Sequence, residues 1–222
     1  MLEKKQLILF DLDGTLINSS PDLAAAINHM LHTLGRKYVL EAEVDSWVGN
    51  GALMLVKRAL SGSVIPSDQL DETELEEAMA CFLDYYGKHL CVRTHCYTGV
   101  SETLEQLQQR GYIMVIVTNK PHAFVSPILE GLGISGYFSA ILGGDSLSRK
   151  KPDPLPLTQM MTDFGIALEA CVMVGDSKND ILAARAAGME SIAVTYGYNY
   201  TEPISFYQPD RIIETFAEIL EV

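Results

Sequence analysis

The chain has 222 residues, of which 48% are hydrophobic and 20% are charged, and its formal net charge is −13. This balance is typical of a folded globular protein and excludes a disordered or fibrous one, and the length fits one large domain or one domain with a smaller insertion. Because an acidic surface repels phosphate backbones and anionic lipids, we expect neither a nucleic acid nor a membrane as a partner.

The first predicted element is a buried strand over Leu7–Phe10, which follows a short charged segment. Its apolar run is too short for a signal peptide or a membrane span, so we expect a cytoplasmic protein. A chain of this size without an export signal is expected to keep its cysteines as reduced thiols, and a Cys91–Cys96 disulfide is the alternative. The cysteines are Cys81, Cys91, Cys96 and Cys171.

Residues 18–91 are predicted to form an all-helical insertion directly after this strand. Ser20 and Pro21 are typical of a helix start, with Ser20 as the N-cap and the proline in the first turn. Apolar residues then recur at helical spacing, and the pattern repeats over Val44–Leu60 and Asp71–Leu90. No strand is predicted within this insertion.

After the insertion, apolar β-rich runs alternate with helical patterns. The predicted strands are Ile113–Thr118, Ala140–Leu142, Cys171–Val174 and Ser191–Thr195, and the predicted helices are Val100–Arg110, Ala123–Leu132 and Asp180–Ala187. This alternation predicts βαβ crossovers. The expected fold is therefore α/β, with a doubly wound parallel sheet formed by residues 1–17 and 92–222 and covered by helices on both faces.

Two carboxylates, Asp11 and Asp13, directly follow the first predicted strand, and Gly14 then permits a turn that most residues would resist. Residues two apart in an extended chain project to the same side. A calcium-binding EF-hand loop that starts at Asp11 is excluded, because the chain has Leu16 and Asp22 where that loop needs glycine and glutamate. A solvated junction between strand and loop remains the alternative.

A second acidic segment, which contains Asp176 and Asp180, follows a later strand. The carboxyl ends of parallel strands open onto one edge of the sheet, so we expect these acids to meet Asp11 and Asp13 there. Clustered carboxylates raise one another's pKa, and a bound Mg²⁺ with oxygen ligands is the expected compensation. Helix capping is the alternative explanation for Asp176 and Asp180 taken alone.

Polar residues follow two further strands. Thr118 and Asn119 stand ahead of a helix, where a hydroxyl and backbone amides can hold phosphate oxygens, although such residues also serve as simple caps. Lys151 lies in the basic segment Arg149–Pro152 after another strand. In so acidic a protein, this lysine is a candidate for the cation that an anionic ligand needs, and a solvated loop is the alternative.

Taken together, these segments resemble the haloacid dehalogenase-like (HAD) phosphatase superfamily. Asp11–Thr15, Thr118, Lys151 and Gly175–Asp180 are similar to its four motifs, in order and at strand ends. A helical insertion directly after the first motif resembles the C1-type cap of this superfamily. The resemblance covers the whole chain and implies a Rossmann-like HAD core that carries an inserted helical cap.

The resemblance also implies a role for each motif residue. Asp11 would be the nucleophile that forms an aspartyl-phosphate, and Asp13 would protonate the leaving oxygen and then activate water. The side chains of Asp11 and Asp176, with the backbone carbonyl of Asp13, would hold Mg²⁺. Lys151 would add positive charge, and Asp180 would orient Lys151 or a metal-bound water.

Further residues are expected to bind the substrate. Thr118 and Asn119 would hold the oxygens of the transferred phosphoryl group, and Thr15 would orient Asp13. In the cap, a turn is expected to present backbone amides to a small carboxylate, and a basic residue follows it in the same segment, with a solvated basic patch as the alternative. These cap candidates are Gly49, Asn50, Gly51 and Arg58.

The second, third and fourth motifs are similar in particular to those of the bacterial phosphoglycolate phosphatase family. This likeness implies a small anionic phosphate monoester as substrate, with 2-phosphoglycolate expected to give glycolate and phosphate. A sugar-phosphate phosphatase or a phosphoglucomutase on the same core is the alternative enzyme, and a phosphoaccepting regulatory module is the alternative of another class. We expect a monomer or a homodimer.

Overall fold

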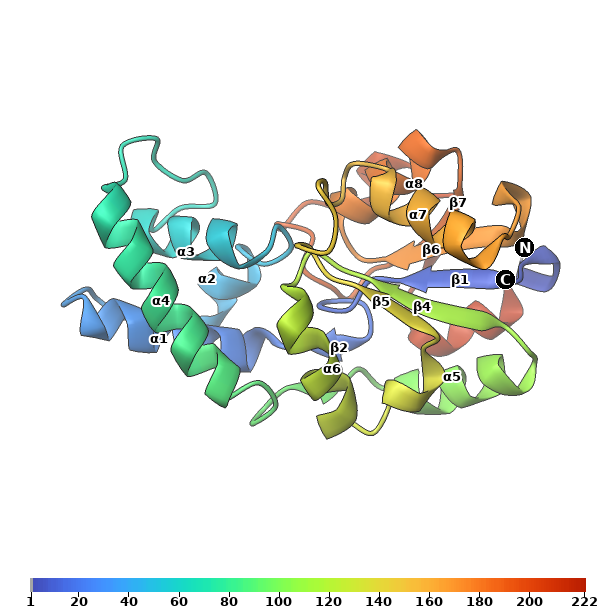
Figure 1. The fold of residues 1–222 in the computed structure, drawn as a ribbon, viewed down its shortest axis with the longest axis horizontal. Coiled ribbons are helices and arrows are strands. Elements are labelled where there is room, and N and C mark those ends of the chain that lie inside the picture. Colours follow the sequence, from blue (N-terminus) through green and yellow to red (C-terminus); the bar gives the residue numbers. More distant parts are fainter. Residues whose placement is uncertain (1) are drawn as a thin grey trace.

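The computed structural model describes residues 2–222, which form two regions side by side (Figure 1). One region is a six-stranded parallel sheet with helices on both faces, and both chain termini lie at its far end. The other region is a group of four helices at the opposite end of the molecule. The predicted doubly wound α/β core with a helical insertion is confirmed.

The sheet has the strand order β5-β4-β1-β6-β7-β8, and every neighbouring pair is parallel. Its strands are β1 (Leu7–Phe10), β4 (Ile113–Val117), β5 (Ala140–Leu142), β6 (Cys171–Gly175), β7 (Glu190–Val194) and β8 (Arg211–Ile213). The sequence analysis predicts the first five but not the edge strand β8. Two of the three residues of β8 are exposed, so it lacks the buried apolar run that identifies the others.

Helices cover both faces of this sheet. They are α5 (Val100–Gln109), α6 (His122–Gly131), α7 (Leu155–Phe164) and α8 (Lys178–Ala187), with 3₁₀ turns at Leu2–Lys4, Ser135–Tyr137, Leu168–Ala170, Ile204–Tyr207 and Phe216–Glu221. Because side chains alternate along a strand, Ile8 and Phe10 pack with α5 and α6, while Leu7 and Leu9 pack with α7 and α8. Both faces of β1 are therefore buried, and its carboxyl end is the part left to meet a ligand.

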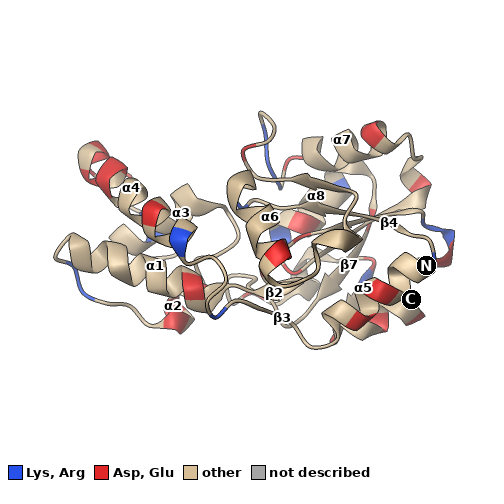
Figure 2. Cartoon of the chain, turned by 60° about the horizontal axis from the view of Figure 1, so that its bottom comes forward, with Lys and Arg blue, Asp and Glu red and all other residues tan. Residues whose placement is uncertain are grey.

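The cap region consists of α1 (Ser20–Thr33), α2 (Glu41–Asp45), α3 (Ala52–Ser61) and α4 (Glu72–Lys88), and it has a buried apolar cluster of its own. Acidic residues occur in both regions, several of them on α4 (Figure 2). The helical pattern predicted over Val44–Leu60 is divided between the end of α2 and α3, with the expected turn at Gly49–Gly51 between them. The chain leaves the helix after α2 because Gly49 and Gly51 take positive φ angles of 118° and 85°, which glycine adopts readily.

A short two-stranded ribbon joins the cap to the core. β2 (Ile17–Asn18) pairs antiparallel with β3 (His95–Cys96), so the chain enters and leaves the cap through the same ribbon. Next to it, the buried Asp22 carboxylate accepts hydrogen bonds from the backbone N–H groups of residues 92–94. Two-residue strands carry no periodic signal, so the sequence analysis misses them. The division of the chain at residues 18 and 91 stays a prediction.

The start of α1 differs by one residue from the prediction. Ser19, not Ser20, is the N-cap, and Pro21 lies in the first turn as expected. The Ser19 hydroxyl makes no capping bond and instead donates to Asp13 Oδ1 at 2.5 Å. The start of the cap is thereby tied to the loop after β1.

The four cysteines are free thiols, so the alternative of a Cys91–Cys96 disulfide is wrong. Cys171 is buried and the other three are partly buried.

Among the helices of residues 2–222, none combines the length and the apolar character needed to cross a bilayer.

Candidate active site

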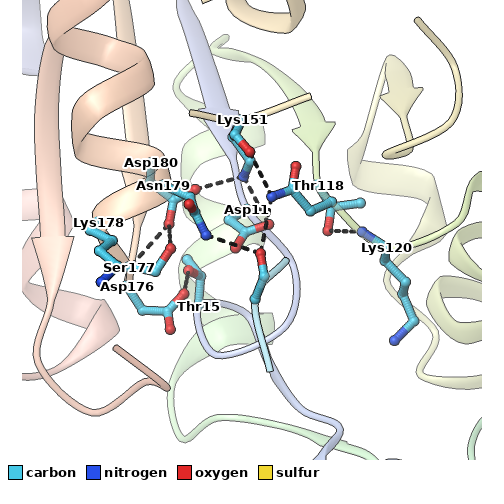
Figure 3. A network of polar contacts seen from close by, with 12 residues as sticks. Asp11, Thr15, Thr118, Lys120, Lys151, Asp176, Ser177, Lys178, Asn179 and Asp180 are labelled. Carbon is cyan, nitrogen blue, oxygen red and sulfur yellow. Dashed lines mark hydrogen bonds and ion pairs between the residues drawn. The ribbon is translucent and has the colours of Figure 1, made fainter. Parts of the chain in front are cut away.

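Polar residues converge at the carboxyl ends of three adjacent strands (Figure 3). Asp11 follows β1, Thr118 follows β4, and Asp176 follows β6. Because β1 lies between β4 and β6 in the parallel sheet, these residues meet although they are far apart in the sequence. One carboxylate oxygen from each of Asp11, Asp176 and Asp180 lies within 4.8 Å of the others, whereas the side chain of Asp13, expected in the same cluster, pairs with Lys120.

A buried lysine lies against these carboxylates. The Lys151 side chain is 1% exposed, and its Nζ donates to Asp180 Oδ1 at 2.6 Å and lies 3.0 Å from Asp11 Oδ1. Burial works against its charge, but Asp11 and Asp180 more than offset this and raise the pKa of Lys151. Asp180 Oδ2 also accepts hydrogen bonds from the backbone and hydroxyl of Ser177, so Asp180 caps α8 and fixes Lys151 at the same time.

Asp176 is fixed by two donors. Thr15 Oγ1 donates to its Oδ1 at 2.9 Å, and the Tyr198 backbone N–H donates to its Oδ2 at 2.6 Å. Thr15 therefore hydrogen-bonds to Asp176, whereas the sequence analysis expects it to orient Asp13. Gly14, with φ of 89°, packs so closely that a Cβ there would lie 2.3 Å from Asp176 Oδ2. This turn after β1 requires glycine.

The charge balance of this cluster fits a divalent cation. Asp11, Asp176 and Asp180 face one lysine, Lys151, which leaves two negative charges in excess. Burial raises the pKa of Asp11 to about 7, although Lys151 works in the opposite direction, and burial together with Asp11 and Asp180 raises the pKa of Asp176. Asp11 Oδ1 is buried, and within residues 2–222 it has Lys151 Nζ as an ion-pair partner at 3.0 Å but no donor in hydrogen-bond geometry. Oxygen donors of this kind suit a hard divalent ion such as Mg²⁺, which would favour their ionised forms.

A second buried ion pair, which the sequence analysis does not single out, joins Lys120 to Asp13. Lys120 Nζ lies 2.8 Å from Asp13 Oδ1, the oxygen that also accepts from the Ser19 hydroxyl. Burial opposes the charge of Lys120, but Asp13 raises its pKa overall. In Figure 3, Lys120 lies on the other side of Asp11 from Asp176. A lysine three residues after the end of β4, in so acidic a chain, was the signal that could have identified this pair.

The two polar residues after β4 are both buried at the site. Thr118 Oγ1 accepts from the Lys120 backbone N–H at 3.2 Å. Asn119 Nδ2 donates to the Lys151 carbonyl at 2.9 Å and to the Gly49 carbonyl at 3.0 Å. Asn119 therefore connects the rim of the sheet with both the lysine loop and the cap.

A cavity lies between the rim and the cap, with about 480 Å³ of space that includes its open mouth. Its lining comprises Asp11, Asp13, Leu23, Val48, Gly49, Gly51, Ala52, Leu55, Phe82, Tyr86, Thr118, Asn119, Lys120, Pro121 and Phe124. Of the predicted cap residues, Gly49 and Gly51 reach the cavity. Arg58 lies behind the turn, where it donates to the Trp47 carbonyl at 2.6 Å and to Asn50 Oδ1 at 2.9 Å.

Comparisons with known proteins identify the family. The family described as haloacid dehalogenase-like hydrolase matches residues 8–194. The chain belongs to the haloacid dehalogenase-like hydrolases. The predicted family resemblance is thus confirmed.

Several relatives of this HAD-like hydrolase are named phosphoglycolate phosphatase. The protein of that name from Colwellia psychrerythraea is 48% identical, with 99% of this chain and 97% of the relative covered. The one from Vibrio parahaemolyticus is 47% identical, with 98% and 95% covered. The crystal structure of a predicted phosphoglycolate phosphatase from Haemophilus somnus has a TM-score of 0.92 and 43% identity, with 98% of this chain and 97% of that one covered. The fold and the enzyme class predicted from sequence agree with these relatives.

In this HAD-like hydrolase, the cap turn at Gly49 and Asn50 is held against the core. Asn179 Nδ2 donates to the Gly49 carbonyl at 3.1 Å and to the Tyr200 hydroxyl at 2.9 Å, and that hydroxyl donates to Asn50 Oδ1 at 2.8 Å. Lys150 Nζ donates to the Asn50 carbonyl at 2.7 Å. The sequence analysis misses these core residues because their partners belong to a distant segment of the chain.

Proposed function

We propose that the protein is a Mg²⁺-dependent phosphatase that hydrolyses 2-phosphoglycolate to glycolate and phosphate. The observation that carries the reaction is the meeting of Asp11, Asp176 and Lys151 at one rim of the sheet. The choice of substrate is supported by relatives at 47% and 48% identity that carry the name phosphoglycolate phosphatase.

In the proposed first step, a carboxylate oxygen of Asp11 attacks phosphorus, and the bond between phosphorus and the ester oxygen breaks. Asp13 gives its proton to the departing oxygen, so that glycolate leaves as a neutral alcohol at that position. The phosphoryl group is then held as an ester of Asp11, which divides one difficult displacement into two easier ones.

In the second step, Asp13 takes a proton from water as the water oxygen attacks phosphorus. The bond to Asp11 breaks, and phosphate and the free carboxylate are restored. Ser19 and Lys120 together fix the orientation of Asp13 for both steps.

The remaining residues would position and neutralise charge. Asp11, Asp176 and the Asp13 backbone carbonyl would hold Mg²⁺, which when bound supplies positive charge to offset repulsion between nucleophile and phosphate. Lys151 brings a second positive charge, held in place by Asp180. Thr118 and the Asn119 backbone N–H would bind the equatorial oxygens of the transferred group.

The proposal is tested by phosphate release from a panel of esters with and without Mg²⁺. The panel contains 2-phosphoglycolate, glucose 6-phosphate, glucose 1-phosphate and ethyl phosphate. We expect many turnovers per chain, the largest kcat/KM for 2-phosphoglycolate, loss of activity in EDTA and recovery with excess Mg²⁺.

Other outcomes would contradict the proposal in different ways. A larger kcat/KM for a sugar phosphate would favour a sugar-phosphate phosphatase, and conversion of glucose 1-phosphate to glucose 6-phosphate would favour a mutase. Phosphorylation of the chain without further turnover would favour a regulatory module. Undiminished activity after metal removal would contradict the metal site.

A further inference from the structure

The cavity presents a further polar group next to the Asp13–Lys120 pair. Tyr86, from α4 of the cap, lines the cavity and is 1% exposed, and its hydroxyl makes no hydrogen bond within residues 2–222. A buried hydroxyl without a partner costs free energy, so a group that accepts from it is expected. Burial raises the pKa of Tyr86 to about 12, and the hydroxyl therefore remains a donor at neutral pH.

The ring that carries this hydroxyl is held in place. Tyr86 stacks on Phe82 with ring centroids 5.6 Å apart, and it meets Phe124 edge-on at 5.3 Å. Phe82 comes from the cap and Phe124 from α6 of the core, so the ring is packed between the two regions. A side chain fixed in this way loses little conformational entropy when a ligand binds.

Lys120 supplies positive charge beside Tyr86. Its Nζ lies 4.9 Å from the centre of the Tyr86 ring, and it is the one basic residue among the described residues that line the cavity. An ammonium group has three donors, and one of them is directed to Asp13 at 2.8 Å. Lys120 can therefore bind Asp13 and an anionic ligand at once.

We propose that Lys120 and Tyr86 form the subsite for the substrate's carboxylate and so select phosphate esters of short 2-hydroxy acids. This proposal rests on the proposed function, because it takes Asp13 as the group that faces the ester oxygen. In 2-phosphoglycolate the carboxylate carbon is two bonds from that oxygen. A carboxylate at this distance falls beside the cation that contacts Asp13, and the Tyr86 hydroxyl donates to it.

The remaining cavity wall agrees with a short substrate. Leu23, Val48, Leu55 and Phe82 contribute apolar surface to the same cavity. Such a wall suits a methylene group and offers no partner to the hydroxyls of a sugar. An ester that lacks the carboxylate would leave the Tyr86 hydroxyl without a partner and Lys120 with Asp13 alone.

The experiment compares two esters of equal length, 2-phosphoglycolate and ethyl phosphate, with the Mg²⁺-loaded protein. Tyr86→Phe removes only the hydroxyl and keeps the packed ring. We expect kcat/KM for 2-phosphoglycolate to fall about 10- to 100-fold, the range for a hydrogen bond to a charged group, and kcat/KM for ethyl phosphate to change less than about 2-fold. Tyr85→Phe, one residue away and stacked on His29 and His89 instead, is the matched control and should change neither value.

Lys120→Met provides a second variant. Because Lys120 also holds Asp13, we expect slower hydrolysis of both esters, with the loss larger for 2-phosphoglycolate by at least about 10-fold. Equal losses for the two esters in both variants would overturn the subsite, since a purely structural role affects both alike. An unchanged kcat/KM for 2-phosphoglycolate in Tyr86→Phe would overturn it as well.

Binding separates this proposal from the proposed function. In an Asp11→Asn background, calorimetry should show that Tyr86→Phe weakens 2-phosphoglycolate about 10-fold or more and leaves ethyl phosphate unchanged. If the wild-type protein hydrolyses neither ester, the proposed function fails, and this selective loss of binding would still support the subsite. Equal affinities in the two proteins would overturn the subsite even where hydrolysis is normal.

Discussion

The two sides of the cavity are built from different chemistry. On the core side, charged groups stand at strand ends and pair with one another, as Lys151 does with Asp11 and Asp180. On the cap side, the lining is apolar except for backbone groups at Gly49 and Gly51 and the hydroxyl of Tyr86. Under the proposed roles, the core side carries the phosphoryl chemistry, and substrate choice is shared between Tyr86 of the cap and Lys120 of the core. Substitutions confined to the cap should therefore act mainly on substrate choice.

The largest expected effect comes from the core side. Asp11→Asn removes the proposed nucleophile, and we expect phosphate release to fall at least about 1,000-fold. The fold should be retained, because asparagine has the same shape and removes one of three crowded charges. Circular dichroism would check the fold, and activity within about 10-fold of wild type would contradict the assignment.

Lys151→Met is expected to have the next largest effect. It leaves Asp11 and Asp180 buried without their cation, so kcat should fall about 100- to 1,000-fold. The metal-free variant should also lose about 3 kcal/mol of unfolding free energy, the usual cost of breaking a buried pair. Urea titrations with and without Mg²⁺ would measure this loss of unfolding free energy. We expect excess Mg²⁺ to restore part of the lost stability.

On the cap side, Gly49→Ala should reduce kcat/KM by about 10-fold, because the substitution strains a backbone with positive φ. Its Cβ would also lie 2.5 Å from the Tyr200 hydroxyl and push the turn away from the core. Combining it with Tyr200→Phe should restore part of the loss. Gly62→Ala is the matched control, since Gly62 also has positive φ but nothing lies within 4 Å of its added Cβ; an equal loss of activity there would contradict the steric explanation.

The smallest expected effect is on stability against pH. Because the pKa of Asp11 is about 7 in the folded protein and near 3.8 ordinarily, the folded state retains a proton that the unfolded chain has released between these values. The metal-free protein should therefore lose stability as the pH rises from about 4 to 7, with little further change above that. Melting temperatures at pH 5 and 8 would measure this, and Asp11→Asn or added Mg²⁺ should reduce the difference.

The core side was largely predictable from the sequence. Asp11, Thr118 and Asp176 each follow a buried apolar strand, and the rule that parallel strands open at one edge places them together. Lys120 escaped notice although it stands next to Asn119, because its partner Asp13 belongs to another strand end. The local pattern of apolar residues identifies where each strand ends, but it does not show which charged residues from different strand ends form ion pairs.

The cap side was less predictable for a physical reason. Helical spacing cannot tell which face of a helix meets a separate domain, so Arg58 was expected at the substrate and lies behind the turn. In the sequence, Tyr86 is one of several aromatic residues of α4. Its packing against Phe124 of α6 and its place in the cavity lining are properties of the folded structure alone. The β2–β3 ribbon is too short for any periodic signal.

That ribbon has a mechanical consequence. Since the polypeptide crosses between the two regions twice at one place, we expect this ribbon to act as a hinge about which the cap rotates. Ile17 and Ser19 stand only a few positions after Asp13, and the Ser19 hydroxyl is bonded to it. We therefore expect an outward swing of the helices to disturb Asp13, the proposed proton donor, so that closing of the cap and orientation of this carboxylate are linked.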